Sequence, residues 1–197
     1  MAESADKTPA SPGLTHIRGV RERARCLHDR DAVDSAIQTL AEQLTADFAD
    51  RNPLVLTVMN GGVVLAGQLL PLLDFPLEVD YLHATRYNNS TTGSALAWRA
   101  QPGTSLRDRV VLILDDILDV GSTLLAIVEH CREQGAESIA TAVLVDKRHE
   151  RKAAPGLKAD YTGLYAEDAY LFGYGMDYKG YWRNAPGIFA VADQDLE

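Results

Sequence analysis

The feature that most constrains the fold of this 197-residue chain is a run of five aliphatic residues that ends in two adjacent carboxylates. The run extends from Val110 to Leu114, and Asp115 and Asp116 follow it. Such a run is typical of a strand that is covered on both faces, as in a parallel sheet. The residues beyond it show the spacing of one apolar helix face, namely Leu124, Ile127, Val128 and Cys131. We therefore expect a strand-to-helix loop from Asp115 to Thr123, at the carboxyl edge of an α/β sheet.

The expected loop offers two kinds of chemistry side by side. Ligands of open α/β sheets bind outside the carboxyl ends of the strands, and a helix N-terminus has free N–H groups that suit a phosphate. Gly121 lets the backbone approach an anion, and Ser122 and Thr123 add hydroxyl donors. Asp115 and Asp116 would repel a phosphate, so we expect them to face vicinal hydroxyls or a hard cation such as Mg²⁺.

From spacing alone, a purely structural interpretation of the loop stays open, in which Asp119 only caps the helix and complements its dipole. The order of residue types is more specific. Val111 to Thr123 resembles the signature of the type I phosphoribosyltransferases: four aliphatic residues, two acidic residues, two aliphatics, Asp, a small residue, Gly, any residue and Thr. The chain departs from it at Asp115, where Glu is more usual, and at Val120, where the family usually has a Thr or Ser that donates to the 5-phosphate.

The resemblance implies a role for each part of this loop. Asp115 and Asp116 would hold the ribose hydroxyls and, directly or through water, Mg²⁺, while Asp119 would accept a proton near purine N7. The 5-phosphate would bind to the residues that follow, namely Val120, Gly121, Ser122 and Thr123. Because Val120 has no hydroxyl group, the backbone N–H groups must serve at that position.

A second loop is predicted where Asn60, Gly61 and Gly62 follow the aliphatic strand Leu54 to Met59. Paired glycines between a strand and a helix allow close approach of a ligand, although most such pairs are only turns. In the resembling family this loop receives pyrophosphate, often across a cis peptide bond that would here join Met59 and Asn60. The family often has Lys or Arg where this chain has Asn60. The resemblance therefore implies that pyrophosphate binds to the backbone of Asn60 and Gly61.

Two further strands, Leu77 to Ala84 and Leu96 to Ala100, are expected to form a hairpin with a long polar tip. A flexible hairpin alone would explain the tip. The 6-oxopurine branch of the family, however, has a mobile lid with a Ser-Tyr pair and a downstream Thr-Gly. Arg86-Tyr87 and Thr92-Gly93 match that pattern, apart from Arg in place of Ser. The resemblance therefore implies a lid that excludes water, with Arg86 and Tyr87 on the pyrophosphate side.

Basic residues follow another expected strand, Ser138 to Val145. Such residues are most often solvated surface charge. In the resembling family, however, a purine-selecting Lys follows this strand, and it corresponds to Lys147. An ammonium group has donors and no acceptor, so it favours a ring carbonyl and disfavours a 6-amino group.

The C-terminal part is rich in aromatic residues, which more often mark a core or an oligomer interface than a ligand site. The order of residue types from Asp168 to Arg183 nevertheless resembles the purine-binding hood of the family. The match implies that Tyr170 stacks on the base and that the Leu171 backbone carbonyl meets the N1 edge. It also implies that Asp177 lies near the base or a second metal ion and that Arg183 contacts pyrophosphate.

Charge and composition exclude several other classes. The chain has 19 Lys plus Arg against 28 Asp plus Glu, a formal net charge of -9, so no nucleic-acid or membrane partner is expected. Its two cysteines, Cys26 and Cys131, indicate no disulfide framework and fit a reducing, cytoplasmic location. Polar residues and a proline interrupt the long uncharged stretch from Pro53 to Leu73, so a strand, a turn and a buried helix explain it better than a membrane span.

We therefore expect an α/β fold with a mainly parallel twisted sheet flanked by helices, as in the type I phosphoribosyltransferases. A single domain over residues 14–197 would follow a disordered tail over residues 1–13. A small hood would come mainly from residues 160–197, and the hairpin would form a flexible lid. The implied activity transfers the 5-phosphoribosyl group from 5-phosphoribosyl 1-diphosphate to hypoxanthine or guanine, giving IMP or GMP and pyrophosphate, in a homodimer or homotetramer.

Three alternatives stay open. A phosphoribosyltransferase for xanthine, adenine or a pyrimidine would share the loop, and Lys147 argues only against adenine. A non-catalytic regulator on the same fold would be a binding module, although the acidic balance disfavours nucleic acid as its partner. A phosphoacceptor receiver domain also uses an Asp pair after a strand and a later Lys. Its further Asp would have to be Asp160, but no apolar strand precedes that residue.

Overall fold

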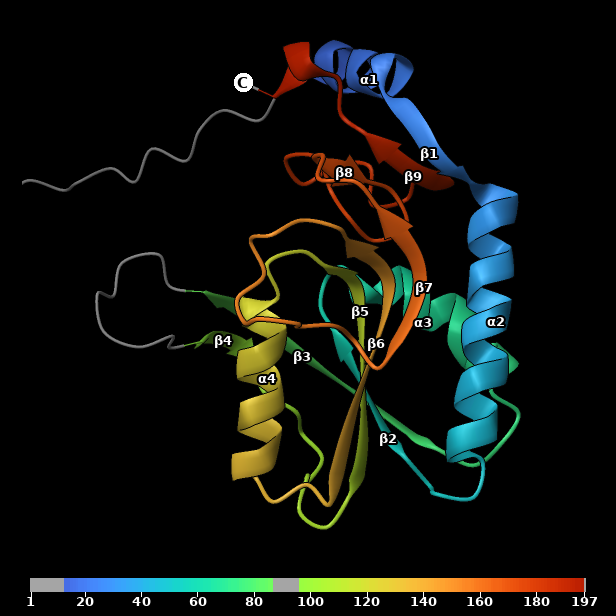
Figure 1. Cartoon of the computed structure of the whole chain (residues 1–197), viewed down its shortest axis with the longest axis vertical. Coiled ribbons are helices and arrows are strands. Elements are labelled where there is room, and N and C mark those ends of the chain that lie inside the picture. The colour runs from blue at the N-terminus through green and yellow to red at the C-terminus, as the bar shows by residue number, and fades with distance from the viewer. Residues whose placement is uncertain (1–12, 87–95, 197) are drawn as a thin grey trace, which may run out of the picture.

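The structure is a computed structural model that describes residues 13–86 and 96–196. Its centre is a six-stranded sheet in the order β4-β3-β2-β5-β6-β7 (Figure 1). Neighbouring strands are parallel except for β3 and β4, which form an antiparallel pair. The strands are β2 (Leu54–Val58), β3 (Glu78–Arg86), β4 (Leu96–Ala100), β5 (Val110–Leu118), β6 (Ser138–Lys147) and β7 (Tyr161–Ala166). The mainly parallel α/β sheet predicted from the sequence is confirmed.

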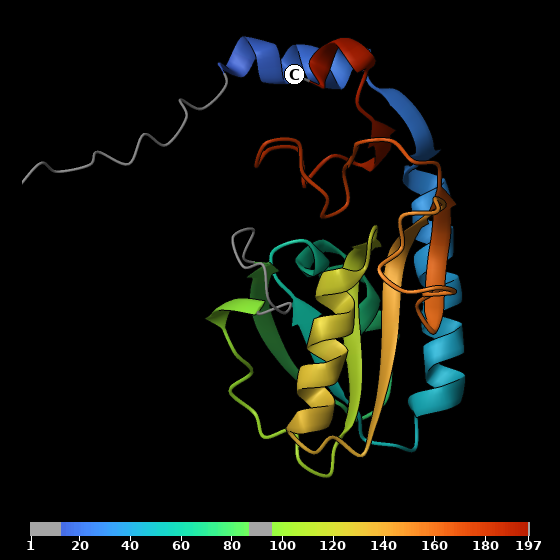
Figure 2. The same ribbon diagram turned by 60° about the vertical axis from the view of Figure 1, so that its left-hand side comes forward.

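Helices cover both faces of this sheet (Figure 2). Two of them, α2 (Arg30–Phe48) and α3 (Gly62–Leu69), pack on one face, and α3 continues into the 3₁₀ turn η1 (Leu70–Leu72). The helix α4 (Ser122–Glu133) packs on the other face. Each face of the sheet therefore has its own apolar core.

Side chains alternate between these two cores along β5. Leu112 and Leu114 join the core under α2 and α3, whereas Val111 and Ile113 join the core under α4. Successive residues of a strand point to opposite faces, so a strand that is buried on both sides needs an apolar residue at every position. This two-sided burial explains the uninterrupted aliphatic run in the sequence.

A smaller antiparallel sheet lies above the carboxyl ends of the parallel strands (Figure 1). It consists of β1 (Arg25–Asp29), β9 (Gly187–Ala190) and β8 (Leu171–Phe172), and the helix α1 (Leu14–Arg23) and the turn η2 (Asp193–Asp195) lie beside it. We call α1, β1 and residues 170–196 the hood. It faces the edge of the main sheet at which the sequence predicted a binding site.

Both ends of the chain build the hood, whereas the sequence suggested mainly residues 160–197. Arg23 donates two hydrogen bonds to the Asp195 carboxylate, at 3.0 and 2.7 Å. The indole nitrogen of Trp182 donates to the backbone carbonyl of Ile17 at 2.7 Å. These contacts join residues more than 160 positions apart in the chain. Local sequence patterns do not encode such pairings, which is why the part played by α1 and β1 was missed.

Two boundaries differ from the predicted ones. The central strand does not end at Leu114 but continues to Leu118, because its last residues keep pairing with β6. Asp115 and Asp116 therefore lie within β5, and the loop begins only after Leu118. In the same way, Lys147 is the last residue of β6 and does not follow that strand.

Some predictions fall outside the described residues. They concern the tail over residues 1–12 and the lid tip with Tyr87 and Thr92-Gly93, and the side chain of Arg86 is not described either. Among the described residues, no helix combines the length and apolar character that a membrane crossing requires. The uncharged stretch 53–73 instead forms β2, a glycine turn and α3 with η1, as predicted.

Candidate active site

A cavity of about 490 Å³ lies between the carboxyl edge of the main sheet and the hood. Side chains from β3, β4, β5 and β6, from the turn after β2 and from the hood line it. It brings together ten residues that the sequence singled out, namely Asn60, Gly61, Asp115, Asp116, Asp119, Lys147, Tyr170, Leu171, Asp177 and Arg183. These residues come from four separate segments, so their convergence is a property of the fold.

The acidic pair lies at the floor of this cavity. The side chain of Asp116 is buried, and its backbone N–H donates to Asp115 Oδ1 at 2.9 Å. Burial raises the pKa of Asp115 well above its ordinary value, and the neighbouring carboxylate raises it further. Burial also raises the pKa of Asp116, although the Arg183 guanidinium partly offsets this. Hydroxyl donors or a hard cation such as Mg²⁺ would relieve both effects, so the pair fits either ligand.

Asp116 is confined between two glycines from distant parts of the chain. A Cβ atom on Gly61 would overlap the Asp116 carboxyl group, and one on Gly175 would overlap the carbonyl oxygen of Gly61. Gly175 also has a φ of 108°, a left-handed backbone that favours glycine. The peptide bond between Met59 and Asn60 is cis, as the resemblance implied. The glycine turn therefore presses its backbone directly against the acidic end of β5.

We expect Gly61→Ala to displace the Asp116 carboxylate, because the new methyl group would occupy the space of that carboxyl group. Misplacing a substrate-positioning group by about 1 Å costs on the order of 10²-fold in rate. Turnover should therefore fall by about that factor, as measured by initial rates under substrate saturation. The matched control is Gly67→Ala in α3, where an added Cβ meets no atom within 4 Å. Equal activity of the two variants would contradict this role of Gly61.

Asp119 lines the cavity and is held by basic side chains. Lys147 Nζ lies 3.1 Å from Asp119 Oδ2, and His149 Nε2 lies 2.7 Å from Asp119 Oδ1. Burial by itself raises the pKa of Asp119, but the hydrogen bonds from Lys147 and His149 outweigh it and leave this pKa below its ordinary value. The side chain is still 43% exposed. Asp119 is thus an ionised carboxylate that a ligand in the cavity can reach.

Asp119, His149 and Asp168 also form a group of possible metal ligands, with their ligand atoms within 4.8 Å of one another. Cations already occupy this group, however. Lys147 Nζ lies 3.4 Å from Asp168 Oδ1, and Arg151 lies 2.6 Å from the same oxygen. A divalent cation would have to displace both of them. The group therefore fits an ion-pair network, and the acidic pair of β5 is the better candidate for a metal.

The hood contributes aromatic and charged residues to the opposite wall. Arg183 donates to the Gly175 carbonyl at 2.5 Å and pairs with Asp177 at 2.5 Å. The second oxygen of Asp177 accepts from the backbone N–H of Gly180 at 2.7 Å. Each of these oxygens keeps a further lone pair, so the contact of Asp177 with a metal, direct or through water, stays a prediction. Tyr170 is 46% exposed, so its ring is available for stacking.

The predicted phosphate loop lies beside this cavity and does not line it. Gly121 precedes α4 with a φ of 83°, and a Cβ atom there would meet the side chains of Leu118 and Leu157. The N-cap residue of α4 is Gly121, which has no side chain to cap the helix. Val120, Ser122 and Thr123 are half-buried, and the Val120 carbonyl accepts from the backbone of residue 153 at 2.8 Å. The amide groups at this helix N-terminus suit an anion, but binding there stays a prediction.

Sequence reasoning missed several residues of the site. His83 and Thr85 of β3 and Arg99 of β4 line the cavity. The spacing of two between His83 and Thr85, which places them on one face of a strand, could have indicated them. No local pattern indicates that His149 and Arg151 reach Asp119, because the course of the loop after β6 determines both contacts.

The receiver-domain alternative does not agree with the structure. Asp160 directly precedes β7, so it lies at the amino edge of the parallel sheet, opposite to the edge that holds Asp115. Its carboxylate accepts from the backbone N–H and the hydroxyl of Thr141, at 2.8 and 2.9 Å. Asp160 therefore has a structural role and contributes nothing to the cavity.

The fold and the site together define a class. A parallel sheet with an acidic pair at a strand end, followed by a glycine turn into a helix and covered by a hood, is the architecture of a type I phosphoribosyltransferase. A family model described as the phosphoribosyl transferase domain matches residues 26–179. That range is more than half of the chain, and the chain belongs to this family.

Individual relatives agree with this assignment. The chain is 34% identical over 165 residues to the hypoxanthine-guanine phosphoribosyltransferase of Bacillus subtilis (strain 168), covering 83% of this chain and 91% of the relative. It is 32% identical over 175 residues to the hypoxanthine-guanine-xanthine phosphoribosyltransferase of Tritrichomonas foetus, covering 89% and 95%. The crystal structure of a hypoxanthine phosphoribosyltransferase from Staphylococcus aureus superposes with a TM-score of 0.81 at 27% identity, covering 88% of this chain and 94% of that one.

Proposed function

We propose that this protein is a hypoxanthine-guanine phosphoribosyltransferase of purine salvage. It transfers the 5-phosphoribosyl group of 5-phosphoribosyl 1-diphosphate to a 6-oxopurine and releases pyrophosphate, so that hypoxanthine gives IMP and guanine gives GMP. The family membership and the purine specificity in the names of both relatives support this assignment. The chain also spans more than nine-tenths of each of these two relatives, so no large part of their length lacks a counterpart.

The observation that supports a 6-oxopurine most directly is the pairing of Lys147 with Asp119. A donor and an acceptor lie 3.1 Å apart in one cavity. On one edge of a 6-oxopurine that carries a proton on N7, the O6 acceptor and the N7–H donor are neighbours and match this donor and acceptor. The ammonium of Lys147 can donate to O6 while the carboxylate of Asp119 receives the N7 proton. A 6-amino group would present donors to Lys147, which also has only donors.

The remaining residues divide between the ribose and the leaving group. As the bond between C1 and the pyrophosphate oxygen breaks, positive charge develops on the ribose and negative charge on the pyrophosphate. Asp115 and Asp116 would bind the ribose hydroxyls and stabilise the positive charge nearby. Arg183 and the backbone of Asn60 and Gly61 would stabilise the pyrophosphate. Tyr170, Leu171 and Asp177 would hold the base against the hood, and the 120–123 loop would bind the 5-phosphate.

Mg²⁺ is the proposed cofactor. Its preferred ligands are carboxylate oxygens and substrate phosphates, and the acidic pair of Asp115 and Asp116 supplies the former. When bound, it would neutralise charge on the pyrophosphate. Asp177 would assist directly or through water, since its oxygens keep further lone pairs beside their contacts with Arg183 and the backbone of Gly180.

We propose a cytoplasmic location and a homodimer or homotetramer. The free thiols of Cys26 and Cys131 fit a reducing compartment. Val79 and Tyr81 stand two residues apart on one face of β3 and are about half exposed, so they offer an apolar surface for a second copy.

A panel of bases tests the function. Purified protein is incubated with Mg²⁺, 5-phosphoribosyl 1-diphosphate and one base at a time, and the nucleotides are separated by chromatography. We expect IMP and GMP but no AMP, together with stoichiometric pyrophosphate. Formation of XMP in addition would extend the substrate range to xanthine. Formation of AMP or a pyrimidine nucleotide alone would favour a different phosphoribosyltransferase, and no nucleotide from any base would favour a non-catalytic regulator.

A further inference from the structure

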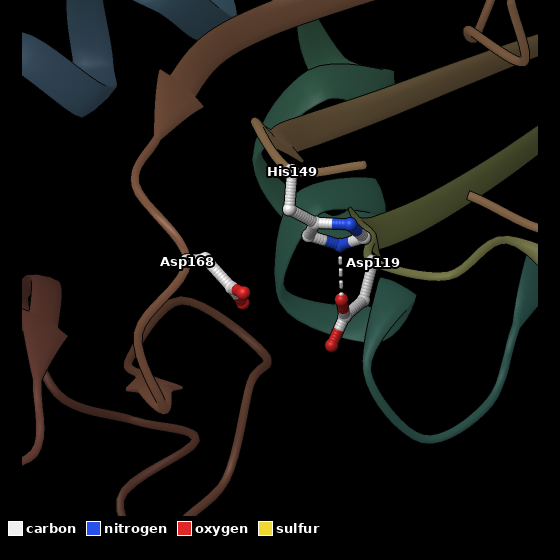
Figure 3. Close-up of side chains that lie close together, drawn as sticks. All are labelled: Asp119, His149 and Asp168. Carbon is white, nitrogen blue, oxygen red and sulfur yellow. Dashed lines mark hydrogen bonds and ion pairs between the residues drawn. The ribbon is translucent and has the colours of Figure 1, made fainter. Parts of the chain in front are cut away.

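His149 is a buried histidine in direct contact with Asp119, and neither the sequence motifs nor the function described above uses it. Its side chain is only 4% exposed, and its Nε2 lies 2.7 Å from Asp119 Oδ1 (Figure 3). We propose that His149 is a positioning residue, which orients the Asp119 carboxylate so that its other oxygen receives the proton of the incoming base. This inference rests on the proposed function and deepens it.

The second ring nitrogen of His149 determines the direction of this hydrogen bond. The backbone N–H of Arg151 points at His149 Nδ1 with a distance of 3.0 Å. A backbone N–H can only donate, so Nδ1 is an acceptor. The ring proton therefore sits on Nε2, which donates to Asp119 Oδ1. A histidine fixed through one nitrogen by the backbone presents the other nitrogen in a defined direction.

The two oxygens of Asp119 consequently have different partners. Lys147 engages Oδ2 and His149 engages Oδ1. Lys147 must turn toward the purine O6 to select the base, and Oδ2 then loses its partner and faces N7. In the reaction the N9 lone pair forms the bond to C1, the C1–O electron pair leaves with pyrophosphate, and the N7 proton passes to Oδ2. His149 remains on Oδ1 throughout and keeps the carboxylate from rotating.

The backbone of the same loop is held separately. Lys152 Nζ donates to the carbonyl oxygens of Leu118 and Asp119, both at 2.8 Å, and to Asp146 at 2.7 Å. The backbone N–H of Ala153 donates to a further carbonyl of the loop at 2.8 Å. Replacing His149 therefore leaves the backbone of residues 118–120 in place, and it removes two hydrogen bonds, the one to Asp119 and the one from the Arg151 backbone N–H.

The test compares two replacements of His149. In His149→Leu the ring volume is largely kept but the donor is lost, so kcat for IMP formation should fall on the order of 10- to 100-fold. The KM for 5-phosphoribosyl 1-diphosphate should stay unchanged, because no contact to that substrate is altered. In His149→Gln an amide nitrogen can stand near the former Nε2 position, and most of the lost kcat should return. The matched control is Glu150→Gln, an exposed neighbour on the same loop.

A second measurement does not depend on catalysis. ¹⁵N spectra of wild-type protein with labelled histidine, assigned by comparison with His149→Gln, report which ring nitrogen carries the proton. We expect the proton on Nε2, and a proton on Nδ1 would overturn the proposal. So would an active wild type with an unimpaired Leu variant, or a Gln variant as impaired as Leu. A wild type that forms no nucleotide at all would instead overturn the proposed function, and this inference with it.

Discussion

Asp119→Asn should lower kcat for IMP formation by about 10²- to 10⁴-fold, which is the usual contribution of a general base. The amide keeps the size of the carboxylate but cannot accept the N7 proton. Binding of 5-phosphoribosyl 1-diphosphate should persist, because the residues proposed for the ribose and pyrophosphate, Asp115, Asp116 and Arg183, are unchanged. Steady-state kinetics would give kcat, and isothermal titration calorimetry would give the affinity for 5-phosphoribosyl 1-diphosphate.

Asp168→Asn is the control for this experiment. Asp168 is as exposed as Asp119, at 42% against 43%, and it shares Lys147 as an ionic partner. It does not line the cavity, so no proton transfer is assigned to it. Its replacement should change kcat only slightly. If the two variants lost the same factor, the charge balance around Lys147 would explain the effect and Asp119 would not be the base.

The sequence was informative where one local segment determines both structure and chemistry. The aliphatic run, the acidic pair and the glycine before the helix lie within 14 consecutive residues, Val110 to Thr123, and each has a physical reason to be there. The strand is buried on both faces, the carboxylates lie in its carboxyl-terminal half, and Gly121 has a positive φ. The cavity positions of Lys147 and of the hood residues were reached differently, through their order along the chain compared with a known family.

The parts that escaped prediction depend on contacts between distant segments. The continuation of β5 to Leu118 depends on pairing with β6, which the sequence of β5 alone does not reveal. The pairing of Arg23 with Asp195 joins the two ends of the chain. His149 reaches Asp119 only because residues 148–157 return toward the loop after β5. There Lys152 binds the backbone carbonyls of Leu118 and Asp119. A run of polar residues after a strand has the same sequence pattern whether it folds back onto a neighbouring loop or stays in solvent.

The composition raises the question of how an acidic chain binds a polyphosphate, and the charged side chains of the cavity bear on it. A chain with a net charge of -9 repels a polyphosphate substrate as a whole. Within the cavity, however, Arg99, Lys147 and Arg183 line the walls. Two of these cations are paired with acidic residues, Lys147 with Asp119 and Arg183 with Asp177. A substrate that replaces one of these carboxylates as the partner gains a contact with the cation. Four carboxylates, those of Asp115, Asp116, Asp119 and Asp177, line the same cavity, so a bound cation such as Mg²⁺ would have to balance them when a polyphosphate binds.

Lys147→Met should weaken the discrimination between 6-oxopurines and 6-aminopurines. Lys147 is buried, with its side chain 8% exposed, and its only assigned ligand contact is to O6. A site built to hydrogen-bond one substrate group can reject an analogue that lacks it by about 10⁴-fold, so losing the donor should reduce the ratio of kcat/KM for hypoxanthine to that for adenine by on the order of 10²-fold. The fold should survive, because Asp119 keeps His149 and Asp168 keeps Arg151 as partners.

The same variant should shift the pH dependence of kcat/KM in a defined direction. Lys147 lowers the pKa of Asp119, against the effect of burial. Removing Lys147 raises the pKa of Asp119, so Asp119 becomes protonated at a higher pH. The acidic limb of the profile of kcat/KM against pH therefore moves to higher pH. His149, Arg151 and Asp168 also face Asp119 or its partners and stay in place, so the shift reports the loss of Lys147 alone.

Lys158→Met, at an exposed lysine beyond this loop, is the control for both predictions and should leave both the base preference and the acidic limb unchanged. An unchanged preference in Lys147→Met would show that another residue selects the base, and an acidic limb that stayed in place would show that Asp119 does not set it.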